Sequence, residues 1–189
     1  TAIVIILIIS IGVYLNTLPN EFVYDDEPQV LGNPWLRDIK HIPEIFFSSA
    51  WSFQDKEIIS NYYRPLMHII YMIDYYTFGL KPWGFHLTNI IFHAGVTVLV
   101  FLIASILLGQ FINPKSQIPN LKSEILSPAF IAALLFAAHP IHTEAVTWVG
   151  GIPELSFTLF YLLSFYFYIY SIRDKSLNGR GSCKSIEET

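Results

Sequence analysis

Three consecutive carboxylates, Asp25, Asp26 and Glu27, form the longest acidic run of this 189-residue chain. Neighbouring carboxylates repel one another, so such a run usually binds a cation, shares a proton or faces a basic group. A carboxylate in this setting can act as a general base or as a metal ligand. A solvated acidic turn before Pro28 would explain the same residues, and both interpretations stay open.

A single arginine, Arg64, stands directly before Pro65 and an apolar stretch at 66–76 that is expected to be helical. Proline suits the first turn of a helix, which places Arg64 at its start. The planar guanidinium can hold a phosphate through two parallel hydrogen bonds. The alternative is an arginine at the lipid headgroup boundary that pairs with lipid or with Asp74.

Polar residues also recur along one stripe of the apolar segment that follows Lys81. His86, Asn89 and His93 are spaced i, i+3 and i+7, which puts them on one face of a helix. Polar groups on a membrane helix are expected to face the protein interior or a wet cavity. Hydrogen bonding between helices is the alternative to a functional role.

A third polar group, His139, His142 and Glu144, follows another apolar segment. Imidazole and carboxylate side chains can ligate a divalent metal, although this spacing is not that of a zinc protease. Ionisable residues beside membrane segments are costly to place, which favours a functional role for them.

The elements that must position these residues are membrane helices. The chain is 53% hydrophobic and 14% charged, with a mean hydropathy of +0.47, and its net charge of −4 argues against a nucleic-acid partner. A span needs about 20 apolar residues in a helix. We therefore predict an all-α integral membrane fold with about four transmembrane helices, near residues 1–15, 86–112, 125–139 and 154–172.

Charge distribution predicts how these helices are oriented. Basic residues concentrate in the expected tail at 173–189, which the positive-inside rule assigns to the cytoplasm. The long loop at 16–85, expected to carry short interfacial helices, then faces the periplasm or the lumen. With four spans, this orientation places the acidic run, Arg64 and the His139–Glu144 turn on the same side of a bacterial inner membrane or of the endoplasmic reticulum membrane.

The motifs in this order resemble one protein family. It is the transmembrane and tetratricopeptide repeat-containing O-mannosyltransferase family with its bacterial relatives, within the GT-C glycosyltransferases. The resemblance covers nearly the whole chain, and residues 1–172 would be the N-terminal part of a GT-C membrane domain. The motifs that carry the resemblance are Phe22-Val23-Tyr24-Asp25-Asp26, Tyr63-Arg64-Pro65-Leu66, Gly84-Phe85-His86-Leu87-Thr88-Asn89 and Ala138-His139-Pro140-Ile141-His142-Thr143-Glu144-Ala145-Val146-Thr147-Trp148.

The resemblance implies an enzyme that transfers a sugar, with mannose expected, from a polyprenyl-phosphate donor to an acceptor hydroxyl of a protein or glycan. It implies Asp25 or Asp26 as the catalytic acid that acts at the acceptor, directly or through a divalent metal such as Mn or Mg. By the same analogy, Arg64, His139 and His142 would bind the donor phosphate, and Asp26 and Glu144 would be metal ligands. Further candidate site residues are Glu27, His86, Asn89, His93 and Glu154.

One residue departs from the family pattern, because Ile152 stands where the family usually has an arginine. The resemblance also implies that further helices and the tetratricopeptide repeats lie outside these residues, so this segment alone is expected to be inactive. A different class of protein remains as the alternative. In it, a transporter or a membrane scaffold would use the polar stripes only to pack helices. A flippase-like binder of lipid carriers lies between the two classes, because it would bind the same polyprenyl phosphate without breaking a bond.

Overall fold

The computed structural model describes residues 2–54, 61–109 and 127–184. Every regular element within these ranges is a helix, which confirms the all-α expectation. In chain order the elements are α1 (Ala2–Gly12), η1 (Leu15–Thr17), η2 (Glu27–Leu31), η3 (Pro34–Arg37), η4 (Ile39–His41), α2 (Ile42–Phe47), α3 (Pro65–Phe78), α4 (Pro82–Gly109), α6 (Pro128–Ala138), η5 (Pro140–His142), α7 (Thr143–Thr147), η6 (Val149–Gly151) and α8 (Ile152–Lys184).

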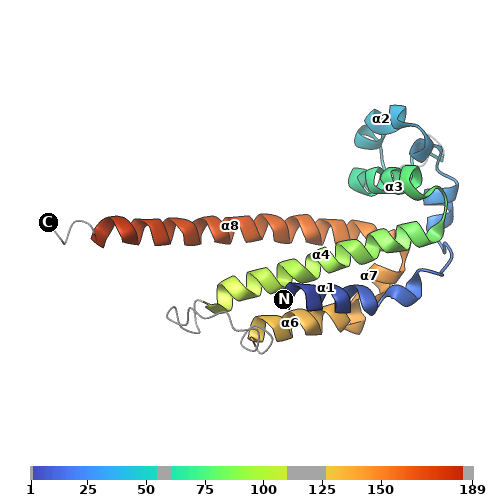
Figure 1. The fold of residues 1–189 in the computed structure, drawn as a ribbon. Helices are drawn as coiled ribbons and strands as arrows, with labels where there is room; N and C mark the ends of the chain where they lie inside the picture. The colour runs from blue at the N-terminus through green and yellow to red at the C-terminus, as the bar shows by residue number, and fades with distance from the viewer. Residues whose placement is uncertain (1, 55–60, 110–126, 185–189) are drawn as a thin grey trace.

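Helix α4 is the centre of the bundle, where it packs against α1, α6 and α8 (Figure 1). Half of its most apolar stretch is buried by these neighbours, compared with 11% of the corresponding stretch of α8. The far part of α8 extends beyond the other helices in Figure 1. Most of the apolar surface of α8 therefore remains exposed among the described residues.

The described residues contain two helices long and apolar enough to cross a membrane, α4 and the segment at 149–173. A third span results if α6 is counted with the following pair of short helices, which bend away from it by 46°. The apolar helix at 2–17 is, within the described residues, shorter than the about 20 residues of a span and is not counted. The prediction of four spans is thus met only as two to three candidate spans.

The helix boundaries differ from the predicted ones in instructive ways. Helix α4 begins at Pro82, four residues before the predicted start at 86, since the proline suits a first turn. Helix α8 continues to Lys184, through most of the stretch expected to be a polar tail. The predicted ends at 110–112 and 125–126 lie outside the described residues.

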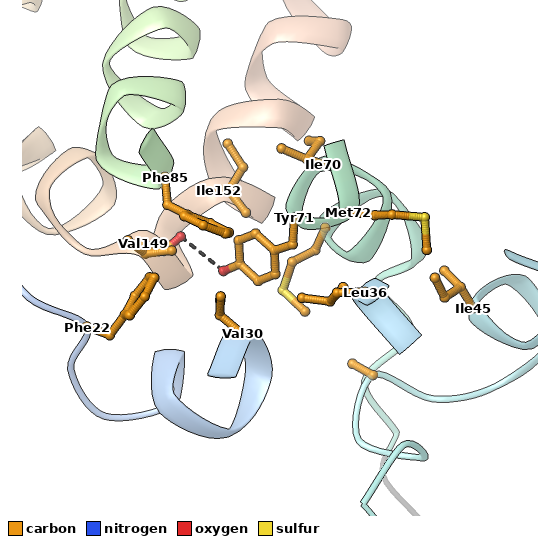
Figure 2. Close-up of a cluster of buried hydrophobic side chains, with 12 residues drawn as sticks. Phe22, Val30, Leu36, Ile45, Ile70, Tyr71, Met72, Phe85, Val149 and Ile152 are labelled. Atoms are coloured by element: carbon orange, nitrogen blue, oxygen red, sulfur yellow. Dashed lines mark hydrogen bonds between the residues drawn. The ribbon is translucent and has the colours of Figure 1, made fainter. Parts of the chain in front are cut away.

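The loop at 16–85 contains short helices, and these gather at one end of the bundle (Figure 1). Pro65 starts α3, and Gly79 ends it with a φ of +69°, a conformation that a residue with a Cβ rarely adopts. An apolar cluster joins this loop to α4 and α8 (Figure 2). Its members include Phe22, Val30, Leu36, Ile45, Ile70, Tyr71, Met72, Phe85, Val149 and Ile152.

Candidate functional site

Three members of the apolar cluster, Ala50, Met67 and Tyr71, line a cavity of about 270 Å³, which we call the acid cavity. Four segments far apart in the sequence line it: the loop after α1, the loop after α2, the start of α3 and the α7–α8 junction. The residues lining it are Asp25, Asp26, Gln29, Ala50, Trp51, Tyr62, Arg64, Met67, Tyr71, Trp148, Gly150 and Glu154. The structure therefore brings together Asp25, Asp26, Arg64 and Glu154, four of the residues predicted from the sequence.

Asp26 is the buried acid of the cavity, with 1% of its surface exposed. Its Oδ2 accepts a hydrogen bond from the backbone N–H of Val23 at 3.2 Å, whereas its Oδ1 has no partner among the described residues. Burial raises the pKa of this carboxyl to about 6, and the nearby N–H groups of Val23, Gly150 and the Trp148 indole partly oppose the rise. A carboxyl with this pKa can exchange a proton near neutral pH.

The turn that holds Asp26 is locally strained. Tyr24 has a φ of +52°, the left-handed region that residues other than glycine seldom occupy. The turn is closed by hydrogen bonds in both directions, because the N–H of Asp26 also donates to the Val23 carbonyl at 3.1 Å. Strain of this kind persists only where the surroundings fix it, and it is concentrated at functional sites.

The three acids have different environments. Asp25 is exposed and lines the acid cavity, where its charge contributes to the raised pKa of Asp26. Glu27 is exposed and does not line the cavity. The acidic run therefore places one carboxylate inside the cavity, one at its wall and one away from it.

The α7–α8 junction lies beside Asp26 in the cavity wall. The hydroxyl of Tyr71 donates to the Val149 carbonyl at 3.1 Å (Figure 2), and Asn89 Nδ2 donates to the Trp148 carbonyl at 2.7 Å. A Cβ on Gly150 would lie 2.5 Å from the Trp148 ring, so only glycine fits there. Helices α3 and α4 thus hold Trp148 and Gly150 against the acid.

Arg64 is the one cation that the described residues contribute to the cavity wall. Its Nη2 lies 3.8 Å from Glu154 Oε1, and its guanidinium carbon lies 5.2 Å from the centre of the Tyr62 ring. Both partners of the ion pair are partly exposed, so the pair contributes little to stability. The guanidinium therefore keeps donors available for an anionic ligand.

An open groove of about 460 Å³ adjoins the acid cavity, and Arg64 and Met67 line both. It runs between the start of α3 and the first turns of α8, and its walls are mostly apolar. We call it the apolar groove. Its remaining lining residues are Tyr63, Pro65, Leu66, Pro153, Ser156, Phe157, Phe160, Tyr161 and Ser164.

The polar stripe of α4 is buried, as its spacing predicts: His86, Asn89 and His93 are each at most 2% exposed. None of the three lines the acid cavity. His93 Nε2 lies 3.2 Å from the Ala137 carbonyl, so His93 connects α4 to the end of α6, and Asn89 connects α4 to the α7–α8 junction. These contacts favour helix packing, the alternative to a functional role. Both ring nitrogens of His86 lack a partner among the described residues.

The turn with His139, His142 and Glu144 does not line the acid cavity either. His139 Nδ1 accepts a hydrogen bond from the Ile141 N–H, and the His142 ring packs 4.2 Å from that of Phe136 and 5.7 Å from that of His93. Glu144 is exposed. The predicted roles of these residues in binding phosphate or metal remain predictions, without support from this arrangement.

The described residues contain no group of three or more His, Cys, Asp or Glu side chains placed to hold a metal ion. The predicted Mn or Mg site therefore has no ready set of ligands in this part of the chain, and no chemical step is assigned to it. Ile152, at the position of the family arginine, is fully buried in the apolar cluster and brings no charge to the cavity.

Sequence reasoning missed several residues of the cavity wall. Gln29 and Tyr71 are single polar residues in mixed stretches, with no spacing that marks them. Trp148 was noticed only as part of a motif, and its contact with the acid depends on how the α7–α8 junction folds back. Only the expectation that the motif residues lie close together in the fold could have indicated these wall residues.

Comparison with known proteins gives relatives along most of the chain. Human protein O-mannosyl-transferase TMTC4 is 32% identical over 180 residues, which cover 92% of this chain and 24% of that protein. Human TMTC2 is 33% identical over 173 residues, covering 91% of this chain and 19% of the relative. Human TMTC3 is 36% identical over 159 residues, covering 84% and 16%.

The chain thus spans no more than about a quarter of the length of these curated relatives. No family model matches it. No solved structure matches it either. The resemblance drawn from the four motifs is nevertheless confirmed by the curated relatives: over the matched residues, the chain is similar to the TMTC protein O-mannosyl-transferases.

Proposed function

We propose that the full-length protein is a membrane glycosyltransferase that moves mannose from a polyprenyl-phosphate donor to a hydroxyl of an acceptor protein. The relatives are named protein O-mannosyl-transferases, which supports a glycosyltransferase acting on protein. The observation that carries the proposal is the acid cavity, where a buried carboxyl with a free oxygen and an arginine line the same small space.

In this reaction the acceptor oxygen attacks the anomeric carbon of the sugar. The bond between that carbon and the phosphate oxygen breaks, and the phosphate leaves with the electron pair. Asp26 takes the proton of the acceptor hydroxyl on its free Oδ1, and Asp25 at the cavity wall orients the acceptor. Arg64 stabilises the charge that develops on the departing phosphate.

The apolar groove supports a lipid-linked donor. A polyprenyl phosphate has an apolar chain that ends in an anion, and the groove joins the acid cavity at Arg64. The chain would lie against Phe157 and Phe160 while its phosphate meets the guanidinium. The cavity would then open on the periplasmic or lumenal side, as proposed for the loop at 16–85.

The test is sugar transfer from radiolabelled polyprenyl-phosphate mannose in membranes that contain the full-length protein, beside an Asp25→Asn/Asp26→Asn double variant. Transfer by the native protein that disappears in the double variant supports the enzyme. Donor that binds without releasing sugar would instead support the flippase-like or carrier-binding alternative.

The lipid part of the proposal has its own test. Phe160→Ser should raise the KM for a long-chain donor by about tenfold, because about one apolar side chain of contact is lost. It should leave the KM for a donor with a very short prenyl chain unchanged. Equal effects on both donors would exclude the groove as the lipid site.

A further inference from the structure

Three buried polar atoms on residues that line the acid cavity have no hydrogen-bond partner among the described residues. They are Asp26 Oδ1, Gln29 Oε1 and Trp148 Nε1. Most buried polar atoms in folded proteins are paired, so three unpaired atoms around one cavity call for a ligand or for bound water. The Trp148 indole N–H lies beside the Asp26 carboxyl and lowers its pKa, and the proposed reaction uses this carboxyl. Gln29 Oε1 is left unexplained.

The orientation of the Gln29 side chain follows from its surroundings. The residue is 5% exposed, and its backbone N–H donates to the Asp25 carbonyl at 2.9 Å within the turn of η2. Its Nε2 lies 3.4 Å from the Ala50 carbonyl, and only the NH₂ end of the amide can donate to a carbonyl. The amide oxygen is therefore the atom that remains available on this cavity wall.

The free atoms of the wall are complementary to a sugar. A pyranose carries hydroxyls that both donate and accept, and its apolar ring face packs against aromatic rings. Gln29 offers an acceptor, and Trp51 and Trp148 offer indole rings. The volume of about 270 Å³ lies just below the range of about 300–1,000 Å³ typical of drug-sized ligands, which suits one sugar unit rather than a glycan chain.

We propose that Gln29 Oε1 accepts a hydrogen bond from one hydroxyl of the transferred sugar, so that this residue determines which sugar is used. This inference rests on the proposed glycosyltransferase function. A site built to bond a hydroxyl discriminates strongly against an analogue that lacks it, because its buried polar atom then stays unpaired.

The experiment compares the native full-length protein with a Gln29→Met variant, which keeps the side-chain volume and removes the amide. The donors are polyprenyl-phosphate mannose and a series of its monodeoxy analogues. With one analogue the native protein should lose about 10- to 100-fold in kcat/KM. The variant should lose a similar factor with mannose itself and nothing further with that analogue. If the loss caused by the variant and the loss caused by the analogue multiply for every analogue, the proposal is overturned and Gln29 has a structural or water-binding role.

Asn33→Ser is the matched control. Asn33 is a second buried amide in the same loop, it does not line the cavity, and serine can replace its oxygen as the cap of η3. This variant should show the same discrimination between donors as the native protein. Sugar selectivity altered equally in both variants would mean that the loop, not the Gln29 amide, is responsible.

A second readout separates this inference from the proposed function. Binding of free mannose 1-phosphate is followed by the fluorescence of Trp51 and Trp148, which both line the cavity. If no variant and no native protein transfers sugar, the proposed function fails. Binding that Gln29→Met weakens by about tenfold still supports the contact with the sugar, and binding that it leaves unchanged excludes it.

Discussion

The acid cavity and the histidine cluster formed by His93, His139 and His142 are both polar regions beside the same membrane helices, yet they differ in how their groups are satisfied. The rings of the histidine cluster pack on Phe136 and on one another, and the nitrogens of His93 and His139 have backbone partners. The acid cavity retains three buried atoms without partners. Buried polar groups that are satisfied hold helices together, and those that are not satisfied are available to a ligand.

This difference distinguishes a ligand-binding role from a helix-packing role, which the spacing of the residues alone does not distinguish. The histidines looked as suitable for binding phosphate or metal as the acids did. The ring contact of His142 with Phe136 and the backbone partners of His93 and His139 favour a packing role.

The largest effect is expected from Asp26→Asn in the full-length protein. Removing the proposed general base should lower sugar transfer about 10²- to 10⁴-fold, with membrane insertion unchanged. The paired variant, His142→Phe, fills the same place beside Phe136 and should keep transfer within about threefold, as expected for a position outside the reaction. The rates of sugar transfer by the purified proteins check both variants. A large loss of transfer in His142→Phe would show that the histidine cluster belongs to the functional site.

A smaller effect is expected when a buried polar side chain that already has a hydrogen-bond partner is removed. Asn89→Leu leaves the Trp148 carbonyl without its donor, which should cost about 1–3 kcal/mol in the free energy of unfolding. The control on the same helix is Ile91→Leu, because Ile91 is 55% exposed and should tolerate the exchange. Thermal unfolding in detergent measures both. Equal stability of the two variants would show that the Asn89 contact does not hold the junction.

The pH dependence of stability provides a third measurement. Burial raises the pKa of Asp26 to about 6 and that of Asp74, which accepts a hydrogen bond from Thr88 at 2.6 Å, to about 7. Between pH 4 and 7 these two carboxyls therefore hold more protons in the folded protein than in the unfolded chain, so their contribution to the free energy of unfolding falls as pH rises. Asp74→Asn should flatten the upper part of this fall.

Melting temperatures of the native protein and of Asp74→Asn, taken at intervals from pH 4 to pH 8, check this expectation. The stability of the native protein relative to Asp74→Asn should fall as pH rises, and a relative stability that increases over the window would contradict the sign. Sugar transfer should move in the opposite direction and rise through a pH of about 6, because Asp26 must lose its proton to act as a base.

The smallest effect is expected from Glu154→Gln. The side chain is 58% exposed and its oxygen lies 3.8 Å from Arg64, so its removal should change the free energy of unfolding by no more than about 1 kcal/mol. Donor binding should become tighter, if anything, because Arg64 loses a competing anion. Weaker donor binding in equilibrium measurements would show that Glu154 itself contacts the ligand.

The sequence predicted the helical class, the buried stripe of α4 and the convergence of Asp25, Asp26 and Arg64. These follow from composition, from helical spacing and from motifs whose order resembles a family. It did not predict that the His139–Glu144 turn lies away from the cavity. The number of spans between two segments predicts the side of the membrane on which they lie, but not their positions around the helix bundle. Sequence reasoning also missed Gln29, whose role depends on a contact with Ala50 across 21 residues.

The left-handed backbone conformation of Tyr24 has a consequence for the rate of the proposed reaction. Its turn is closed by Val23 and Asp26 alone, so the carboxyl is already oriented before any ligand arrives. A preorganised acid needs no reorganisation during the reaction, which removes one source of delay from each turnover. Replacing Tyr24 with glycine would relieve the strain and free the turn to adopt other shapes, and a more stable but slower protein is the expected result.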